Sequence, residues 1–209
     1  MEITHLVDPL SAYEIEMDSA KFLMKYQPGL LAAERPLDVI KLLDDIFQDN
    51  GFSLLLTSDT DLPKPILGLT EMDNKTIKIR ESDYIKCDTD GYPRMTVTHE
   101  VGHARLHYSQ FLRDGMKMCR TQSNYIPPYR SAEWQARVWA SATMMPFPAI
   151  VNLIKESAGK TIVEIIDTIM ESFIVSRSAA EARYGTIVKY KKDGRYDGLE
   201  KSMKKLCKI

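Results

Sequence analysis

The sequence predicts an α+β fold in which helices precede and follow a small sheet. Helical periodicity is found before residue 51 and after residue 93, and strand-like segments lie between residues 52 and 80. Because these strands follow one another without intervening helices, a doubly wound parallel sheet is not expected. The 209 residues, 44% apolar and 27% charged, are typical of a soluble globular protein with a sizeable core.

Two helices are expected in the first 50 residues. Residues 9–27 carry an apolar stripe that begins near Ser11, a suitable N-cap, and ends at Pro28. The segment after Pro36 also has apolar residues at helical spacing, and Gly51 ends it. We therefore expect a helical extension at residues 1–35, followed by the first helix of the core.

Three short strands are expected at residues 52–57, 65–72 and 75–80. In the third strand Ile77 and Ile79 alternate with polar residues, which is the pattern of a half-buried strand. Asp73 and Asn74 are suited to a hairpin turn between the second and third strands. These segments predict a small antiparallel or mixed sheet.

The remaining helices are expected at residues 94–112, 131–145, 147–158, 161–173 and 176–184. The connection at residues 113–130 is long, and loops of this length in compact domains are often functional. The end of the chain, residues 189–209, is rich in lysine. A basic tail of this kind can contact DNA phosphates, but no recognition helix is evident, so we favour a solvated, partly frayed end.

Composition excludes several classes of protein. The net charge is −1, so the whole molecule is not a polycation that coats nucleic acid. No window approaches the roughly 20 apolar residues of a membrane span, and no secretory signal is visible at the start. The three cysteines are widely spaced and odd in number, which favours a reducing cytoplasm over a disulfide framework. We expect a cytoplasmic protein with no membrane partner.

The segment 99–103, HEVGH, carries the strongest chemical signal. Residues four apart on a helix lie about 40° apart around the axis and about 6 Å apart along it, so His99 and His103 can bind one cation. Glu100, about 100° away, can reach a water molecule on that cation and act as the general base of a zinc peptidase. The alternative is a chance pattern on a helix that binds nothing. Gly102 argues against a chance pattern. An internal glycine costs about 1 kcal/mol in helix propensity, so its presence in this helix indicates a packing reason.

A catalytic zinc needs a third protein ligand. His107 lies about 12 Å along the helix from His99, which is too far for both to bind one ion, so we interpret His107 as a supporting or packing residue. Glu133, at the start of a later helix, is the best candidate. An acidic residue there can equally serve to match the helix dipole, and the residues alone leave both roles open.

Two segments together resemble the ImmA/IrrE family of bacterial and phage metallopeptidases. Residues 95–107, MTVTHEVGHARLH, are similar to the family's FTxAHELGHxxLH. Residues 133–146, EWQARVWASATMMP, are similar to its second helix, which begins with Glu and ends at Met-Pro. The order and spacing of the two segments also match, and weaker similarity extends over residues 36–185.

The resemblance implies a zincin-like core at residues 36–149, in which the sheet packs on the helix that carries residues 99–103. It also implies a helical C-terminal region at residues 150–188. It implies one Zn²⁺ per chain, held by His99, His103 and Glu133, with Glu100 as the general base. It also implies an endopeptidase whose protein substrate is a DNA-binding repressor or regulator of a phage, mobile element or stress response.

One departure concerns Arg137, where the family has Asn or Asp. An acidic residue at this place steadies a ligand histidine in related zinc enzymes, and arginine cannot accept that hydrogen bond. Arg137 and the basic tail at residues 189–209 together motivate an alternative, a catalytically weak or inactive protein of the same fold that binds a transcription factor.

Several further residues are candidates for the site. Tyr129 is one candidate to contact the substrate, and Tyr108, Tyr125 and Arg130 could also approach the oxyanion of peptide hydrolysis, but the sequence does not choose among them. Cys119 could occupy the open position of the zinc, although an ordinary loop or core cysteine is the more frequent case.

Overall fold

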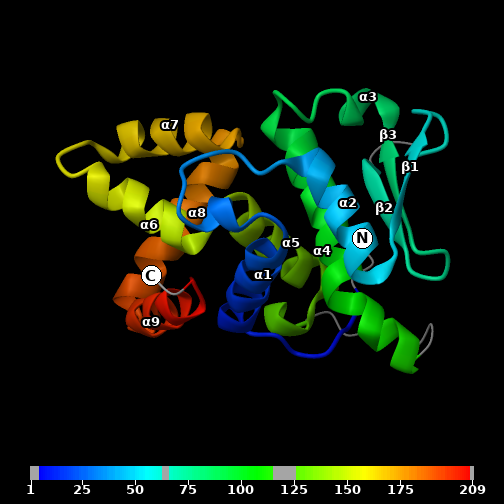
Figure 1. The fold of residues 1–209 in the computed structure, drawn as a ribbon, viewed down its shortest axis with the longest axis horizontal. Coiled ribbons are helices and arrows are strands. Elements are labelled where there is room, and N and C mark those ends of the chain that lie inside the picture. Colours follow the sequence, from blue (N-terminus) through cyan, green and yellow to red (C-terminus); the bar gives the residue numbers. More distant parts are fainter. Residues whose placement is uncertain (1–4, 63–65, 115–125, 208–209) are drawn as a thin grey trace.

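A computed structural model describes residues 5–62, 66–114 and 126–207 of the chain. They form an α+β fold in which a three-stranded sheet lies on one side of a long central helix, and the C-terminal helices lie on the other side (Figure 1). None of the helices in these three ranges is both long and apolar enough to cross a membrane. Cys119 and Tyr125 lie outside the described residues.

The two N-terminal helices are confirmed. Helix α1, Ala12–Tyr26, begins with a capping box, because the Ser11 hydroxyl accepts from the Glu14 backbone and the Glu14 carboxylate accepts in return from the Ser11 backbone. A 3-10 turn, η1 (Pro28–Leu31), follows. Helix α2, Val39–Asn50, ends at Gly51, whose φ of 80° is the left-handed conformation that glycine adopts without strain.

The sheet is mixed. Its strands are β1 (Ser53–Thr57), β2 (Gly68–Glu71) and β3 (Thr76–Arg80), in the order β1-β3-β2. Strand β1 pairs with β3 in parallel, and β2 pairs with β3 in antiparallel orientation across the turn that the sequence predicts. Ile77 and Ile79 are fully buried on the face that packs against helix α4 (Gly91–Asp114). Strand β2 is at one edge of the sheet and also contacts α4, the helix that carries residues 99–103.

Helix α4, Gly91–Asp114, carries the HEVGH segment. It starts three residues before the expected boundary, because Asp90 accepts a hydrogen bond from the Tyr92 backbone and Pro93 is tolerated in a first helical turn. A short helix, α3 (Glu81–Tyr84), occupies part of the expected strand-to-helix connection. Helix α5, Ala132–Met144, matches the expected helix at residues 131–145, lies beside α4 and is capped by Ser131.

The end of the chain differs from the prediction. After α6 (Phe147–Glu156) and α7 (Ile162–Phe173), helix α8 runs over Arg177–Lys192, beyond the expected boundary at residue 184, because Ile187 and Tyr190 extend its buried face. The expectation of a frayed tail is wrong for Arg195–Cys207. These residues form helix α9, which packs Leu199 and Met203 into the core beside α1 and α8.

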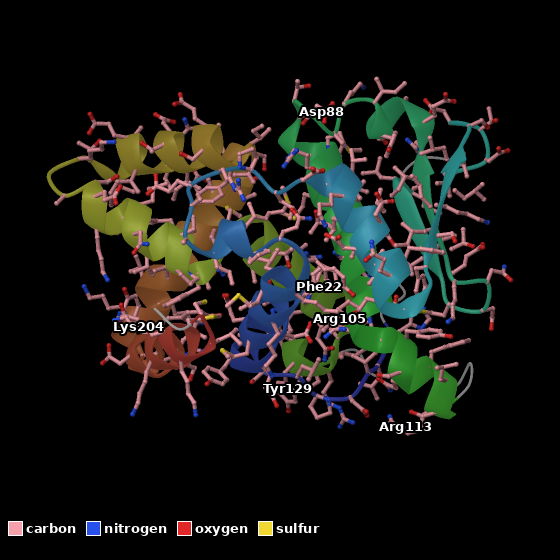
Figure 2. All side chains as sticks on the ribbon, in the orientation of Figure 1. Phe22, Asp88, Arg105, Arg113, Tyr129 and Lys204 are labelled. Atoms are coloured by element: carbon pink, nitrogen blue, oxygen red, sulfur yellow. The ribbon has the colours of Figure 1, made fainter. Side chains whose placement is uncertain are left out.

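Charged pairs join elements that are far apart in the chain. Arg105 of α4 donates to Asp18 of α1 and Asp49 of α2, and it lies next to Phe22 of α1 (Figure 2). The fully buried Arg183 of α8 pairs with the fully buried Glu16 of α1, with an Nη2–Oε2 distance of 3.0 Å. Helix α1 is thereby fastened to both the motif helix and the C-terminal region.

The segment before α1 pairs with the segment before α5. The Val7 amide donates to the Arg130 carbonyl at 3.0 Å, and the Leu10 amide donates to the Tyr129 carbonyl at 2.9 Å. Leu6 and Ser131 form an antiparallel bridge. The N-terminal residues therefore brace the start of α5, the helix that carries Glu133. Another 3-10 turn, η2 (Pro128–Arg130), lies in this region.

Candidate metal centre

His99 and His103 of α4 and Glu133 of α5 converge on one point and can hold a metal ion. The two Nε2 atoms are 3.0 Å apart, and the Glu133 oxygens lie 3.2 Å from His99 Nε2 and 3.4 Å from His103 Nε2. Ligand atoms placed tetrahedrally about 2 Å from a zinc ion are about 3.3 Å from one another. The three side chains thus have the mutual spacing of three corners of a zinc tetrahedron.

This convergence depends on the close approach of α4 and α5. A Cβ atom on Gly102 would lie 3.1 Å from the Ala136 carbonyl oxygen and 3.3 Å from the Ala136 Cα. Glycine therefore lets the α5 backbone approach the motif helix. Ser131 caps α5 and places Glu133 in its first turn, where the N-terminal end of the helix dipole also favours a carboxylate. Of the two roles that the sequence leaves open for Glu133, the structure accommodates both.

The electrostatics of Glu133 favour the ionised form. The two imidazole rings that face it, His103 first and then His99, lower the pKa of its carboxyl well below its usual range, and this effect outweighs the burial that would raise it. The carboxylate is therefore charged at neutral pH and suited to bind a cation.

His107 and Gln135 form a buried chain of hydrogen bonds behind His103. His103 Nδ1 lies 3.2 Å from His107 Nδ1, and His107 Nε2 lies 3.1 Å from Gln135 Oε1. Gln135 Nε2 in turn donates to the Asp8 carbonyl at 2.7 Å and to the Tyr129 carbonyl at 2.8 Å. His107 and Gln135 are 1% and 0% exposed, so these two side chains are shielded from bulk water.

The chain determines which nitrogen of His103 carries a proton. Both amide hydrogens of Gln135 are used by carbonyl groups, so its Oε1 must accept and His107 Nε2 must donate. Burial, and then the neighbouring His103, lower the pKa of His107 to about 3, so its ring is neutral and Nδ1 is an acceptor. When His103 is neutral, as a metal ligand must be, its one proton is therefore on Nδ1, and the lone pair of Nε2 is on the side of the ring that faces Glu133.

Glu100 faces the same cleft and is held by the edge strand. The Thr70 hydroxyl of β2 lies 2.7 Å from Glu100 Oε2 and 2.9 Å from the Glu100 carbonyl oxygen. Gly68, on the same face of β2, leaves room for the Glu100 side chain, because a Cβ atom there would lie 2.8 Å from Glu100 Cγ. The carboxylate is 8% exposed and borders the cleft.

The cleft, of about 650 Å³, brings together some of the predicted residues and leaves others out. His99, Glu100, Glu133 and Arg137 line it. Tyr129 is half exposed at the edge of the molecule (Figure 2) and does not line the cleft; its backbone carbonyl instead supports Gln135. Tyr108 also lies elsewhere, where its ring contacts Phe52 and the Lys75 ammonium group.

Sequence reasoning missed Thr70 and Gln135. Thr70 could have been found from strand alternation, because it pairs with the buried Ile77 and so shares the face that meets α4. Gln135 offers no comparable signal, because its partners come from three separate segments of the chain.

No protein-family model matches the chain, and no curated protein matches it.

Proposed function

We propose that this protein is a zinc-dependent endopeptidase. The observation that carries the proposal is the convergence of two histidines of α4 and one carboxylate of α5, His99, His103 and Glu133, with Glu100 beside them in an open cleft. Two histidines and one carboxylate are the ligand set of catalytic zinc sites that keep a position open for water or substrate. The proton assignment of His103 supports the same conclusion, because it leaves Nε2 free to bind.

The residues around the ion would divide the work of hydrolysis. When bound, zinc would lower the pKa of a water molecule toward about 7 and polarise the scissile carbonyl group. Glu100 accepts the proton of the attacking water and returns it to the leaving amide nitrogen. The Thr70 hydroxyl, 2.7 Å from Glu100 Oε2, holds one oxygen of the carboxylate and so orients the other.

The two sequence motifs support the finer assignment. We propose that residues 36–149 form a zincin-like core related to the ImmA/IrrE metallopeptidases, and that the substrate is a DNA-binding repressor or regulator in the cytoplasm. The packing of the sheet against α4, with edge strand β2 beside Glu100, is consistent with this core.

Zinc content and cleavage, measured on the same samples, test the proposal. We expect about one zinc per chain in the wild type, and cleavage of a complex peptide pool that mass spectrometry detects as new termini. Glu100→Gln keeps the zinc and slows cleavage by about 10²-fold or more, because the general base is lost. Glu133→Ala loses zinc as well as activity.

Two results would contradict the proposal. Unchanged zinc content in Glu133→Ala would remove the third ligand, and full activity of Glu100→Gln would remove the mechanism. If the wild type instead forms a stable stoichiometric complex with an intact transcription factor and cleaves nothing, the alternative of a regulatory binding protein replaces the peptidase.

A further inference from the structure

Arg137 lies in the cleft of the candidate metal centre. It is four residues after Glu133 on α5, so both side chains project from the same face of the helix. Arg137 is exposed and lines the cleft together with His99, Glu100 and Glu133. Among the described residues that line this cleft, it is the one lysine or arginine, and no described carboxylate forms an ion pair with it.

The two carboxylates of the cleft are engaged elsewhere. Glu133 directs its oxygens to His99 and His103, at 3.2 and 3.4 Å. Glu100 has one oxygen bound by Thr70 at 2.7 Å. Neither acid is among the described ion-pair partners of Arg137, so the hydrogen-bond donors of its guanidinium group are available to a bound ligand.

The surrounding walls leave room for such a ligand. Helix α8 contributes only small side chains to this part of the cleft, namely those of Ser178, Ala179 and Ala182. Ser141, one turn beyond Arg137 on α5, is also small. The other wall, from α4, is larger and more apolar, with Tyr92 and Met95.

We propose that Arg137 forms a subsite that selects substrates carrying a carboxylate group close to the scissile bond. This inference rests on the proposed peptidase function. The substrate of a peptidase is a polypeptide, and the anionic groups of an unmodified polypeptide are carboxylates. The planar guanidinium group donates two parallel hydrogen bonds to a carboxylate, which selects geometry as well as charge. The apolar α4 wall then accepts a neighbouring apolar residue of the substrate.

The carboxylate has two sources in a polypeptide, an acidic side chain and the chain end. Digestion of two peptide pools distinguishes them, one with free C-termini and one with C-terminal amides. In the wild type we expect Asp and Glu to be enriched about tenfold at one position near the cleavage site, the discrimination of one charge-assisted hydrogen-bonded pair. Enrichment in both pools identifies a side chain, and cleavage confined to the last residues of the free pool identifies the chain end.

Three variants make the test specific. Arg137→Gln loses the acidic preference, and Arg137→Glu replaces it with a preference for Lys and Arg. Arg195→Gln is the matched control: it removes the same charge from helix α9, where Arg195 pairs with Asp193, and it keeps the wild-type preference. Zinc content is measured on each variant, so that a lost metal is not mistaken for a lost subsite.

A binding measurement separates failure of this inference from failure of the proposed function. Zinc-loaded Glu100→Gln protein is immobilised, and the peptides that it retains are compared with those retained by the double variant with Arg137→Gln. Acidic enrichment that depends on Arg137 supports the subsite even where no cleavage occurs, in which case the peptidase itself is contradicted. Cleavage with the same preference in wild type and Arg137→Gln overturns the subsite alone. The subsite is also overturned if the immobilised protein retains a short oligonucleotide in preference to acidic peptides and this retention depends on Arg137.

Discussion

At the scale of single residues, the centre depends on groups that do not touch the metal position. His103 Nε2 is available as a ligand because Gln135 and His107 together assign the proton of His103 to Nδ1. Outer groups of this kind orient a ligand histidine and increase its basicity. The sequence predicts that His107 is too far along the helix to be a third ligand. In the structure, His107 supports His103 on the side of the ring away from the metal position.

We predict that Gln135→Leu weakens zinc binding about 10- to 100-fold, the usual effect of removing a group that supports a metal ligand. The dissociation constant is measured by competition with a chromophoric chelator. Gln110→Leu is the matched control, because Gln110 also bonds the N-terminal segment, at the Asp8 amide, but contacts no histidine. Equal zinc affinity in the two variants, both shown to be folded by circular dichroism, would contradict the role of Gln135.

At the scale of secondary structure, the candidate metal centre is a product of how α4 packs against α5. Each helix is specified locally, by its cap and its apolar spacing, but the distance between them is set by Gly102. The nearest atoms that a side chain at Gly102 would meet belong to the Ala136 backbone, which can yield only if the whole of α5 moves.

Two glycine substitutions test this packing. Gly185→Ala in α8, where a Cβ atom would meet nothing within 4 Å, should raise the free energy of unfolding by about 1 kcal/mol through helix propensity. Gly102→Ala has the same intrinsic gain, but we expect no net stabilisation and weaker zinc binding, because α5 must shift. Chemical denaturation and chelator competition measure the two effects. If Gly102→Ala stabilised the protein as much as Gly185→Ala, the contact of residue 102 with the Ala136 backbone would not limit how closely α4 and α5 approach.

At the scale of the whole molecule, the first and last helices are held to the core by buried charge. Glu16 and Arg183 are 1% and 2% exposed, and Arg183 also donates to the Met145 carbonyl, at the end of α5. Helix α8, which forms one wall of the cleft, is thus tied to the same structure that positions Glu133.

We predict that Glu16→Gln lowers the free energy of unfolding by about 3–5 kcal/mol, because it leaves the buried guanidinium group of Arg183 without its counter-charge. The comparison is Asp167→Asn, which breaks the solvent-exposed pair of Asp167 with Arg177 and should cost at most about 1 kcal/mol. Urea denaturation of the metal-free proteins gives both values. If the two substitutions lowered the free energy of unfolding by similar amounts, the buried pair of Glu16 and Arg183 would not stabilise the packing of α8 on α1.

Much of the secondary structure could be predicted from the sequence, and so could the residues that can hold a metal ion. The helices and strands followed from periodicity and capping residues, and the pairing of His99 with His103 followed from the geometry of one helix turn. The tail was predicted wrongly, because helix α9 is mainly polar and its few apolar residues, such as Leu199 and Met203, gain their stability only by packing on α1 and α8.

The sequence by itself determined the α+β class and the residues that can hold a metal, because both depend on spacing within single elements. Only the tertiary structure decided that Glu133 meets the two histidines, that Thr70 holds Glu100, that Gln135 sets the proton of His103, and that Arg137 faces the cleft. The contacts of Glu133 with His99, of Thr70 with Glu100 and of Gln135 with His107 join residues 34, 30 and 28 positions apart, and Arg137 faces a cleft that several helices share. Such contacts are fixed by the packing of the whole core, so the spacing of residues within one helix or strand does not reveal which partner a side chain meets.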